Sequence, residues 1–317
     1  MSFGAAERPR ILAADWGSSR LRAWWLAADG AVLGHVASAR GAAGLSGHDA
    51  FSAALRESCG DWLDDPATSR LIVAGMAGGR NAWHETAYLR CPLPLAALRP
   101  GATPHRIGHL AVEIIPGICC DWPDGTFEVI RGEETLALGA ATGGIVCLPG
   151  THSKWVEMSG GAVTRFATFL TGELHAMCLA HGIVGRLAAA AEQVTDAEAF
   201  ARGLDASRGE GGIASTIFRA RTECLAGRLA PASVGAFLSG VLIGAEVAGA
   251  AARLGAAAGG SRSPTAAPAF GVADVTLVAP PTLAALYETA LARAGVAVRQ
   301  VAAEDAFLAG VRRMIGA

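Results

Sequence analysis

The sequence predicts an α/β protein built from two lobes, and three observations favour that fold class. The chain has 317 residues, which is enough for two domains that each bury a core. Two apolar runs, at 11–14 and 145–148, are typical of buried strands, and each leads to a turn that contains Gly and small hydroxyl residues. The order strand, loop and hairpin then occurs in both halves, although their residues are not similar enough to prove duplication. We therefore place one lobe at residues 1–125 and the other at 126–317.

Composition excludes several classes of protein. Hydrophobic residues make up 52% of the chain and charged residues only 17%, which argues against disorder. A net charge of -2 provides no electrostatic surface for nucleic acid. The most apolar stretch, 237–252, is interrupted by Glu246, so we predict no membrane span. The first ten residues lack the apolar segment of a secretory signal, and the seven cysteines are scattered among apolar neighbours. Both observations favour a cytoplasmic protein with reduced thiols.

Short apolar runs predict the strands of the first lobe, and one run at helical spacing predicts a helix. The first strand leads into Asp15. Asp29-Gly30 is a strong hairpin signal between the next two strands, and Pro116-Gly117 stops the last strand. The expected elements of this lobe are strands at 11–14, 21–28, 31–39, 71–74 and 112–115 and a helix at 49–59.

The second lobe repeats the pattern and adds a long helical insertion. Gly160-Gly161 forms the turn of its hairpin, and the insertion, at about 171–254, has breaks near 203–212 and at Pro231. Residues 255–271, rich in Ala, Gly, Ser and Pro, predict a mobile surface loop. The other expected elements are helices at 128–142, 282–294 and 304–315 and strands at 145–148, 154–158, 162–169, 275–278 and 296–301.

The turns after the two apolar runs both have the chemistry of an anion-binding loop. Gly permits a sharp reversal of the backbone, and the following residues offer N–H and O–H donors. Two such turns in corresponding places of two halves predict a nucleotide bound between duplicated lobes. Neither turn has the glycine spacing of a Walker A loop, which excludes the simplest P-loop interpretation. The residues expected to bind phosphate are Gly17, Ser18, Ser19, Gly150, Thr151, His152 and Lys154. For Lys154, projection from an edge strand is an equally good interpretation.

Five motifs that occur in order along the chain resemble the 2-dehydro-3-deoxygalactonokinase family. They are Asp15-Trp16-Gly17-Ser18-Ser19 with Leu21-Arg22-Ala23-Trp24, Ala74-Gly75-Met76-Ala77-Gly78, Arg131-Gly132-Glu133-Glu134-Thr135, Pro149-Gly150-Thr151-His152-Ser153-Lys154-Trp155 and Thr171-Gly172-Glu173-Leu174-His175. The resemblance covers nearly the whole chain. It implies the fold of the actin, sugar-kinase and heat-shock-ATPase superfamily: two ribonuclease-H-like lobes, a mixed sheet in each, and ATP in the cleft between them. It also implies phosphorylation of 2-dehydro-3-deoxy-D-galactonate at its 6-hydroxyl group, with ATP and Mg²⁺ as cofactors.

The resemblance implies roles for the charged residues of the first three motifs. Asp15 is expected to hold magnesium through water, which suits a hard cation that keeps part of its hydration shell. Arg22 is expected to neutralise charge on the transferring phosphoryl group, with Arg20 as the alternative. Glu133 matches the residue that accepts the proton of the attacking hydroxyl, and Glu134 is the alternative. Acidic residues in the first turn of a helix also favourably oppose its dipole, which is the purely structural interpretation of this pair.

Substrate-facing segments follow from the same resemblance. Arg131 is the best candidate for the carboxylate of a sugar acid, because its planar guanidinium can donate two parallel hydrogen bonds. For Trp83 and His175 a place in the core is at least as good an interpretation. The residues expected to face the substrate are Trp16, Met76, Asn81, Trp83, Arg131, Thr171 and Glu173, together with His175.

One departure from the superfamily pattern concerns the nucleotide base. Pro280-Pro281 stands where small glycine-rich residues normally lie against adenine and ribose, which leaves open how the base is held. Two alternatives to the main function also stay open: a kinase for another sugar or sugar acid, and a catalytically silent sensor of nucleotide or sugar acid. The Ala- and Gly-rich segment 234–254 could pack internally or across a homodimer. An ADP-release assay would distinguish the kinases from the sensor.

Overall fold

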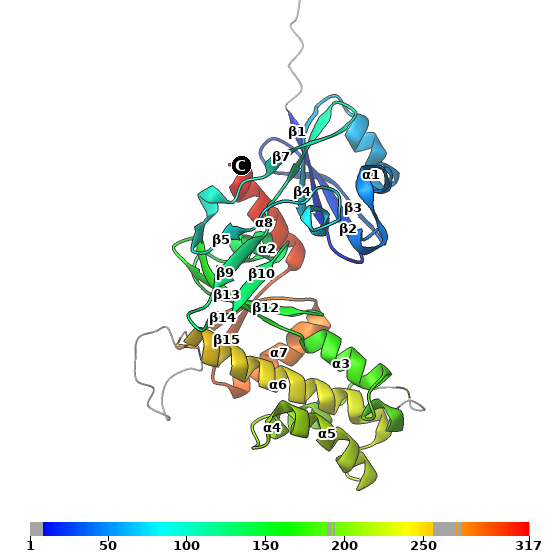
Figure 1. The fold of residues 1–317 in the computed structure, drawn as a ribbon, viewed down its shortest axis with the longest axis vertical. Coiled ribbons are helices and arrows are strands. Elements are labelled where there is room, and N and C mark those ends of the chain that lie inside the picture. Colours follow the sequence, from blue (N-terminus) through cyan, green and yellow to red (C-terminus); the bar gives the residue numbers. More distant parts are fainter. Residues whose placement is uncertain (1–8, 189–191, 193, 256–269, 272–273, 317) are drawn as a thin grey trace, which may run out of the picture. The chain divides into compact units, whose positions relative to one another are not determined.

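The computed structural model describes residues 9–188, 192, 194–255, 270–271 and 274–316, and the chain divides into two compact units (Figure 1). The first unit comprises residues 1–143, 158–165 and 303–317, and the second comprises 144–157 and 166–302. Most of the loop predicted at 255–271 lies outside the described residues. The units therefore divide the chain near residue 143 rather than at 125, and the last helix returns to the first unit.

The first unit is built on a six-stranded mixed sheet with the order β3-β2-β1-β4-β8-β7. Strand β1 is buried and central: it pairs antiparallel with β2 and parallel with β4, so that Asp15 lies between Arg22 and Ala74. The hairpin turn at Asp29-Gly30 is present, with Gly30 at φ +80°. The strands are β1 (Arg10–Trp16), β2 (Leu21–Leu26), β3 (Val32–Ser38), β4 (Thr68–Gly75), β7 (Gly101–Ile107) and β8 (Leu110–Ile114).

The second six-stranded sheet has the order β15-β14-β11-β12-β13-β6. Its first five strands repeat the order of β8, β4, β1, β2 and β3, since a hairpin lies on one side of the first strand and parallel strands lie on the other. The predicted α/β fold with a mixed sheet in each half is thus confirmed. The strands are β6 (Leu93–Pro94), β11 (Gly144–Leu148), β12 (Ser153–Ser159), β13 (Ala162–Phe169), β14 (Asp274–Val278) and β15 (Ala297–Val301).

A small sheet of order β10-β9-β5 corrects the helix predicted at 128–142. Residues 127–130 form β10 (Phe127–Ile130), which pairs antiparallel with β9 (Ile118–Asp121), while β5 (Leu89–Arg90) pairs with β9 from the other side. The hairpin closes through the N–H of Trp122, which donates to the carbonyl of Thr126 at 2.8 Å. Helix α2 (Glu133–Ala140) begins only after Gly132, whose φ of +104° ends the strand. The prediction of helix was wrong for the residues before Gly132, because these residues form a local hairpin with β9 and the helix begins only after the positive φ of Gly132.

Helices α1 (Gly47–Asp64), α2 and α8 (Ala303–Ile315) complete the first unit. Phe51 of α1 enters the core beside Trp16 of β1. Helix α8 lies beside α2, as Figure 1 shows, and its Phe307 stacks on Trp24 of β2. The helices approach so closely that a Cβ atom on Gly139 would lie 1.7 Å from the carbonyl oxygen of Ala306. These contacts explain why α8 belongs to the first unit.

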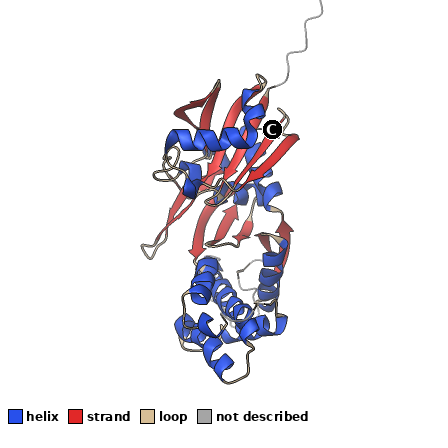
Figure 2. Ribbon diagram, turned by 90° about the vertical axis from the view of Figure 1, so that its right-hand side faces the viewer, coloured by secondary structure: helices blue, strands red, loops and turns tan. Residues whose placement is uncertain are grey.

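Within the described residues between β13 and β14, four helices form the predicted insertion, and Figure 2 shows them gathered in one helical cluster. Gly203 of α4 and Gly240 of α6 let those helices touch backbone to backbone. Helix α6 is long and apolar enough to cross a membrane by composition, but most of it is buried, which identifies it as the core helix of this unit. It therefore packs internally. The helices are α3 (Thr171–Ala180), α4 (Ala197–Ala206), α5 (Gly212–Leu225) and α6 (Val234–Gly255), followed after β14 by α7 (Pro281–Arg293).

Short 3-10 turns connect several of these elements, and the cysteines form no disulfide among the described residues. The turn Met76–Gly78 follows β4 directly, and the other turns are Ala42–Gly44, Leu95–Ala97, Gly185–Leu187 and Pro231–Ser233. All seven cysteines are free thiols, as the sequence predicted.

Candidate active site

Asp15 and Arg22 form an ion pair at the end of the central strand of the first unit. They are cross-strand partners in β1 and β2, and the guanidinium of Arg22 donates a hydrogen bond to the Asp15 carboxylate. Burial raises the pKa of Asp15, and Arg22 partly offsets that effect. Arg20, the alternative to Arg22, lies before β2 and is exposed. The structure therefore distinguishes the two arginines: only Arg22 contacts the predicted metal-binding carboxylate.

Backbone hydrogen bonds fix the turn that follows Asp15. The N–H of Gly17 donates to the carbonyl of Arg20 at 2.9 Å, which closes the turn. The carbonyls of Gly17 and Ser18 accept hydrogen bonds from Ala42 and Ala43, both at 3.0 Å. Ser18 and Ser19 are exposed, and within the described residues their N–H groups have no acceptor. Free backbone donors next to a carboxylate are the arrangement expected for a phosphate that arrives with a cation.

Two glycines bring the first turn of α2 against the end of β4. Gly75 has φ +87°, and a Cβ atom there would lie 2.6 Å from the carbonyl oxygen of Trp16. A Cβ atom on Gly132 would lie 3.2 Å from the Cα atom of Gly75. Gly75 pairs with Trp16 in the sheet, so the start of α2 lies at the same end of β1 as Asp15. Glu133, the first residue of α2, is thereby placed near the Asp15–Arg22 pair in the fold.

Glu133 and Glu134 occupy different environments. Glu134 is fully buried, and its carboxylate accepts hydrogen bonds from the N–H of Gly132 at 2.6 Å and the hydroxyl of Thr135 at 3.1 Å. Glu133 is half-buried, and one of its oxygens accepts the N–H of Arg131 at 3.0 Å. A base must be within hydrogen-bond reach of the alcohol. Partial exposure therefore favours Glu133 as the base, whereas Glu134 shapes the start of the helix.

Stability is expected to depend on the protonation of Glu134. Burial, followed by the adjacent Glu133 carboxylate, raises the pKa of Glu134 to about 7 from its ordinary 4.5. The folded protein therefore binds a proton more tightly than the unfolded chain, so this stabilisation is complete below pH 4.5 and is lost as the pH rises to about 7. In the wild type, the free energy of unfolding is expected to fall by up to about 3 kcal/mol across that range. Glu134→Gln is expected to abolish this fall, because glutamine does not titrate. Urea unfolding at pH 5 and pH 7.5 measures the difference, and an equal pH dependence in the two proteins would contradict this.

Arg131 is held by a neighbour that the sequence did not indicate. Its terminal nitrogens donate to the hydroxyl of Thr86 at 2.5 Å and to the Thr86 carbonyl at 2.9 Å, and the guanidinium lies 4.4 Å from the Tyr88 ring centroid. A Cβ atom on Gly78 would clash with the same guanidinium. The Nε atom is buried, and within the described residues it has no hydrogen-bond partner. The bonds to Thr86 use two of the five N–H donors of this oriented guanidinium, so donors remain for an acidic ligand.

The other predicted substrate-facing residues of the first unit divide into two groups. Trp16 and Trp83 are core residues whose rings meet edge to face, and their indole N–H groups donate to Arg40 and His48. Their side chains are therefore engaged in packing. Met76 and Asn81 are exposed, and Asn81 has the left-handed φ of +59° that Asn tolerates.

The loop between β11 and β12 in the second unit is held by contacts with the start of α3 and by Lys154. His152 and Glu173 pair at 2.5 Å, and the N–H of Glu173 donates to the carbonyl of Thr151 at 3.0 Å. Lys154 is buried, and its Nζ atom donates to the carbonyl of His152 at 3.2 Å. The interpretation of Lys154 as a residue of an edge strand was wrong, because β12 lies between β11 and β13. Its predicted contact with phosphate stays a prediction.

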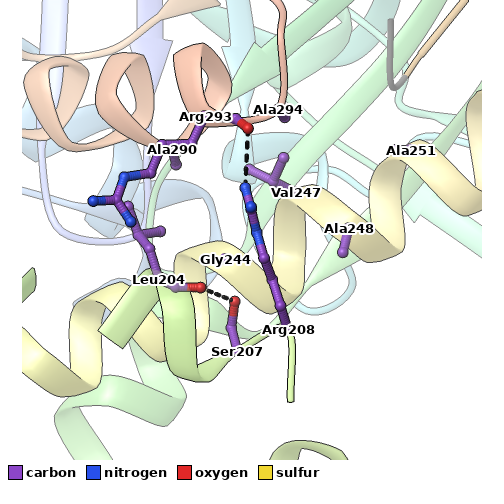
Figure 3. A pocket seen from close by; sticks show the side chains of 10 residues that line it. All are labelled: Leu204, Ser207, Arg208, Gly244, Val247, Ala248, Ala251, Ala290, Arg293 and Ala294. Carbon is purple, nitrogen blue, oxygen red and sulfur yellow. Dashed lines mark hydrogen bonds between the residues drawn. The ribbon is translucent and has the colours of Figure 1, made fainter. Parts of the chain in front are cut away.

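Two cavities in the second unit differ in whether predicted site residues border them. One, of about 300 Å³, is mainly apolar and is bordered by Thr171 and Glu246. The other, of about 170 Å³, lies between α4, α6 and α7, where Arg208 donates to the carbonyl of Arg293 (Figure 3). It contains none of the predicted site residues. His175 borders neither cavity and pairs with the carbonyl of Gly235 at 3.0 Å.

Comparison with known proteins decides the family. The family model for 2-keto-3-deoxy-galactonokinase matches residues 15–314. The chain belongs to this family. A 2-dehydro-3-deoxygalactonokinase of Escherichia coli is 34% identical over 306 residues, covering 96% of each chain. A solved structure of a candidate 2-dehydro-3-deoxygalactonokinase from Sinorhizobium meliloti is 35% identical, with a TM-score of 0.80 over 96% of this chain and 97% of that one.

In this member of the 2-keto-3-deoxy-galactonokinase family, sequence reasoning missed three residues that contact predicted site residues or their neighbours in the chain. Thr86 holds Arg131 from a position 45 residues away, and no local pattern indicates it. Tyr287 of α7 contacts Ser153 of the β11–β12 loop at 3.0 Å. Glu246 accepts hydrogen bonds from Tyr287 and from Trp155. Only Glu246 carried a signal, as a single acid in an apolar helix, and that signal served only to exclude a membrane span.

Proposed function

We propose that this protein transfers the γ-phosphoryl group of ATP to the 6-hydroxyl group of 2-dehydro-3-deoxy-D-galactonate, in the breakdown of galactonate. The observation that carries the proposal is the family match across residues 15–314. The reaction forms a bond between O6 and the γ-phosphorus and breaks the bond from that phosphorus to the β–γ bridging oxygen. The products are the 6-phosphate and ADP. The reaction needs a carboxylate base, a cation for the phosphoryl oxygens and a cation for the sugar acid, and the first unit contains candidates for each.

The proton of the 6-hydroxyl group passes to the Glu133 carboxylate as the phosphoryl group is transferred. In phosphoryl transfer most of the catalysis comes from positioning and charge stabilisation rather than from the base. Arg22 is therefore assigned to the charge on the equatorial oxygens of the γ-phosphoryl group. The pairing of Arg22 with Asp15 fixes the guanidinium beside the strand end, which supports this role.

The residues present fit a magnesium ion that keeps most of its water. Asp15 is an oxygen ligand at a strand end, and among the described residues no group of three or more His, Cys, Asp or Glu side chains could hold a metal. One carboxylate beside free backbone donors suits a cation that is carried largely by a triphosphate. When bound, the ion would neutralise phosphate charge, with Asp15 contacting it through water. The loops at 17–19 and 150–154 keep their predicted role in binding the phosphates.

Arg131 is assigned to the carboxylate of the sugar acid. Its guanidinium is already oriented by Thr86 and Tyr88, so little conformational entropy is lost when a carboxylate binds. Met76, Asn81, Thr171 and Glu173 stay predicted substrate-facing residues. A cytoplasmic location and a homodimer likewise stay predictions.

Removing the anchor of Arg131 is expected to weaken binding of the sugar acid. Thr86→Val deletes the hydroxyl that accepts from Arg131, and the KM for the sugar acid is expected to rise about tenfold while the KM for ATP stays within twofold. Thr103→Val is the matched control, because Thr103 bonds to the carbonyl of Val112 in the sheet of the same unit at 2.9 Å. Steady-state kinetics with each substrate varied measures both constants. Equal rises in both KM values for Thr86→Val would remove Arg131 from the carboxylate role.

The proposed function is tested by coupled ADP release against a panel of acids and sugars. The panel contains 2-dehydro-3-deoxy-D-galactonate, its C4 epimer 2-dehydro-3-deoxy-D-gluconate, D-galactonate and D-galactose. The highest kcat/KM is expected for the first compound, with NMR placing the phosphate on O6. A higher value for another acid would reassign the substrate. Tight binding of ATP and sugar acid without ADP release in the presence of magnesium would identify a sensor instead.

A further inference from the structure

A buried carboxylate in the second unit joins the segments around the β11–β12 loop. Glu246 of α6 is only 2% exposed. Its Oε1 atom accepts the indole N–H of Trp155 at 2.7 Å, and its Oε2 atom accepts the hydroxyl of Tyr287 at 2.8 Å. Ser153 is linked to this carboxylate through Tyr287, whose hydroxyl lies 3.0 Å from the Ser153 hydroxyl. Each oxygen of the buried carboxylate therefore accepts a hydrogen bond, which offsets part of the cost of burying it.

The residues linked to Glu246 border the loop at 150–154. Ser153 begins β12, shares a hydrogen bond of 3.0 Å with Tyr287, and accepts the N–H of Gly150 at 3.4 Å. Trp155 follows the loop on the same strand. Each end of the loop is thus linked to Glu246, either directly or through Tyr287.

Helix α3 packs both on the loop and on α6, the helix that carries Glu246. Thr171 is the first residue of α3, and a Cβ atom on the next residue, Gly172, would lie 2.5 Å from the carbonyl oxygen of Gly150. The start of α3 therefore touches the loop backbone directly. A shift of Glu246 would displace both ends of the loop against this helix start.

An apolar side chain would fill the position of Glu246 at a lower desolvation cost. Replacing buried charged groups with hydrophobic residues of similar volume is often neutral or stabilising, so an acid at this position is poor evidence for stability alone. Its two directional hydrogen bonds do fix β12, through Trp155, and α7, through Tyr287. We propose that Glu246, acting through Tyr287 and Trp155, is a positioning residue that sets the loop at 150–154 for the phosphates of ATP. The proposal rests on the proposed function of that loop.

Tyr287→Phe is the sharpest test, because it removes one hydroxyl and keeps the ring. The KM for ATP and the dissociation constant of a non-hydrolysable ATP analogue are expected to rise about tenfold. The KM for the sugar acid and the dissociation constant of adenosine, which has no phosphates, are expected to stay within twofold. Glu246→Gln, which keeps the shape and one acceptor, is expected to give an effect in the same direction. Titration calorimetry and steady-state kinetics provide the readouts.

Thr216→Val is the matched control, because it removes another buried hydroxyl of the same unit. Thr216 of α5 is 3% exposed and donates to the carbonyl of Gly212 at 2.9 Å. It is expected to lower the Tm without changing either KM. If Tyr287→Phe and Glu246→Gln likewise lower only the Tm, the network is structural and the positioning role is overturned. A wild-type protein that binds the ATP analogue but phosphorylates no acid would instead refute the proposed function, and the calorimetric comparison would still test the positioning role.

Discussion

Replacing Glu133 with glutamine is expected to lower kcat by about 10²–10⁴-fold, the range typical for loss of a general base. Glutamine keeps the size of the side chain and can still accept the N–H of Arg131, so the start of α2 is preserved. It cannot take up the proton of the attacking hydroxyl. The KM values for ATP and for the sugar acid are expected to change by less than about threefold, since the lost interaction belongs to the transition state.

Glu134→Gln is the matched control for this prediction. The two residues are adjacent in the first turn of α2, but Glu134 is fully buried and bonded to Gly132 and Thr135. Its kcat is expected to stay within about threefold of the wild type, because a carboxylate without exposure does not reach the alcohol. A larger loss of kcat for Glu134→Gln than for Glu133→Gln would exchange the two roles. Unchanged turnover in both variants would eliminate a carboxylate base from this helix.

Adding one methyl group at Gly139 is expected to destabilise the first unit by about 3 kcal/mol. A Cβ atom at this position would lie 1.7 Å from the carbonyl oxygen of Ala306 and 2.6 Å from the backbone nitrogen of Gly310. Both atoms belong to the backbone of α8, so no side chain can turn away to make room. Helices α2 and α8 would have to separate, and α2 carries Glu133. Gly139→Ala is therefore expected to lower both the unfolding free energy and kcat.

Gly60→Ala supplies the control, since it adds the same methyl group in a helix of the same unit. A Cβ atom on Gly60 would make only an ordinary contact of 3.7 Å with the side chain of Arg56. Alanine in a helix is favoured over glycine, so a gain of about 0.5–1 kcal/mol is expected. Denaturant unfolding of both variants measures the two free energies. A loss for Gly139→Ala no greater than the change for Gly60→Ala would show that the two helices do not pack as closely as described.

The sequence predicted the parts of this molecule that are encoded in short stretches. The strand that leads to Asp15 and the hairpin that carries Arg22 were recognisable because apolar alternation and turn residues lie next to each other in the chain. The two corresponding turns, at Gly17 and Gly150, also indicated the repeated strand order of the two sheets. Each of these features depends on neighbours within about ten residues.

Features that depend on distant partners were not predictable in the same way. The helix predicted at 128–142 is a different case: residues 128–130 pair with 118–120 in a local hairpin, and the prediction extended the helix backward across Gly132. Lys154 was considered for an edge strand, since only the sheet order shows that β12 lies inside the sheet. Trp16 follows a site aspartate in the sequence, yet strand alternation turns its ring into the core. Thr86 became relevant only when the fold brought it to Arg131.

The place of α8 in the first unit has a consequence for synthesis of the chain on the ribosome. The indole N–H of Trp24 in β2 donates a hydrogen bond to Glu304 of α8, 280 positions later. Helix α2 also packs against α8. Residues 144–302 must be translated before these surfaces find their partner. A nascent first unit therefore exposes apolar surface throughout the synthesis of the second, when chaperone protection matters most for a chain with such distant contacts.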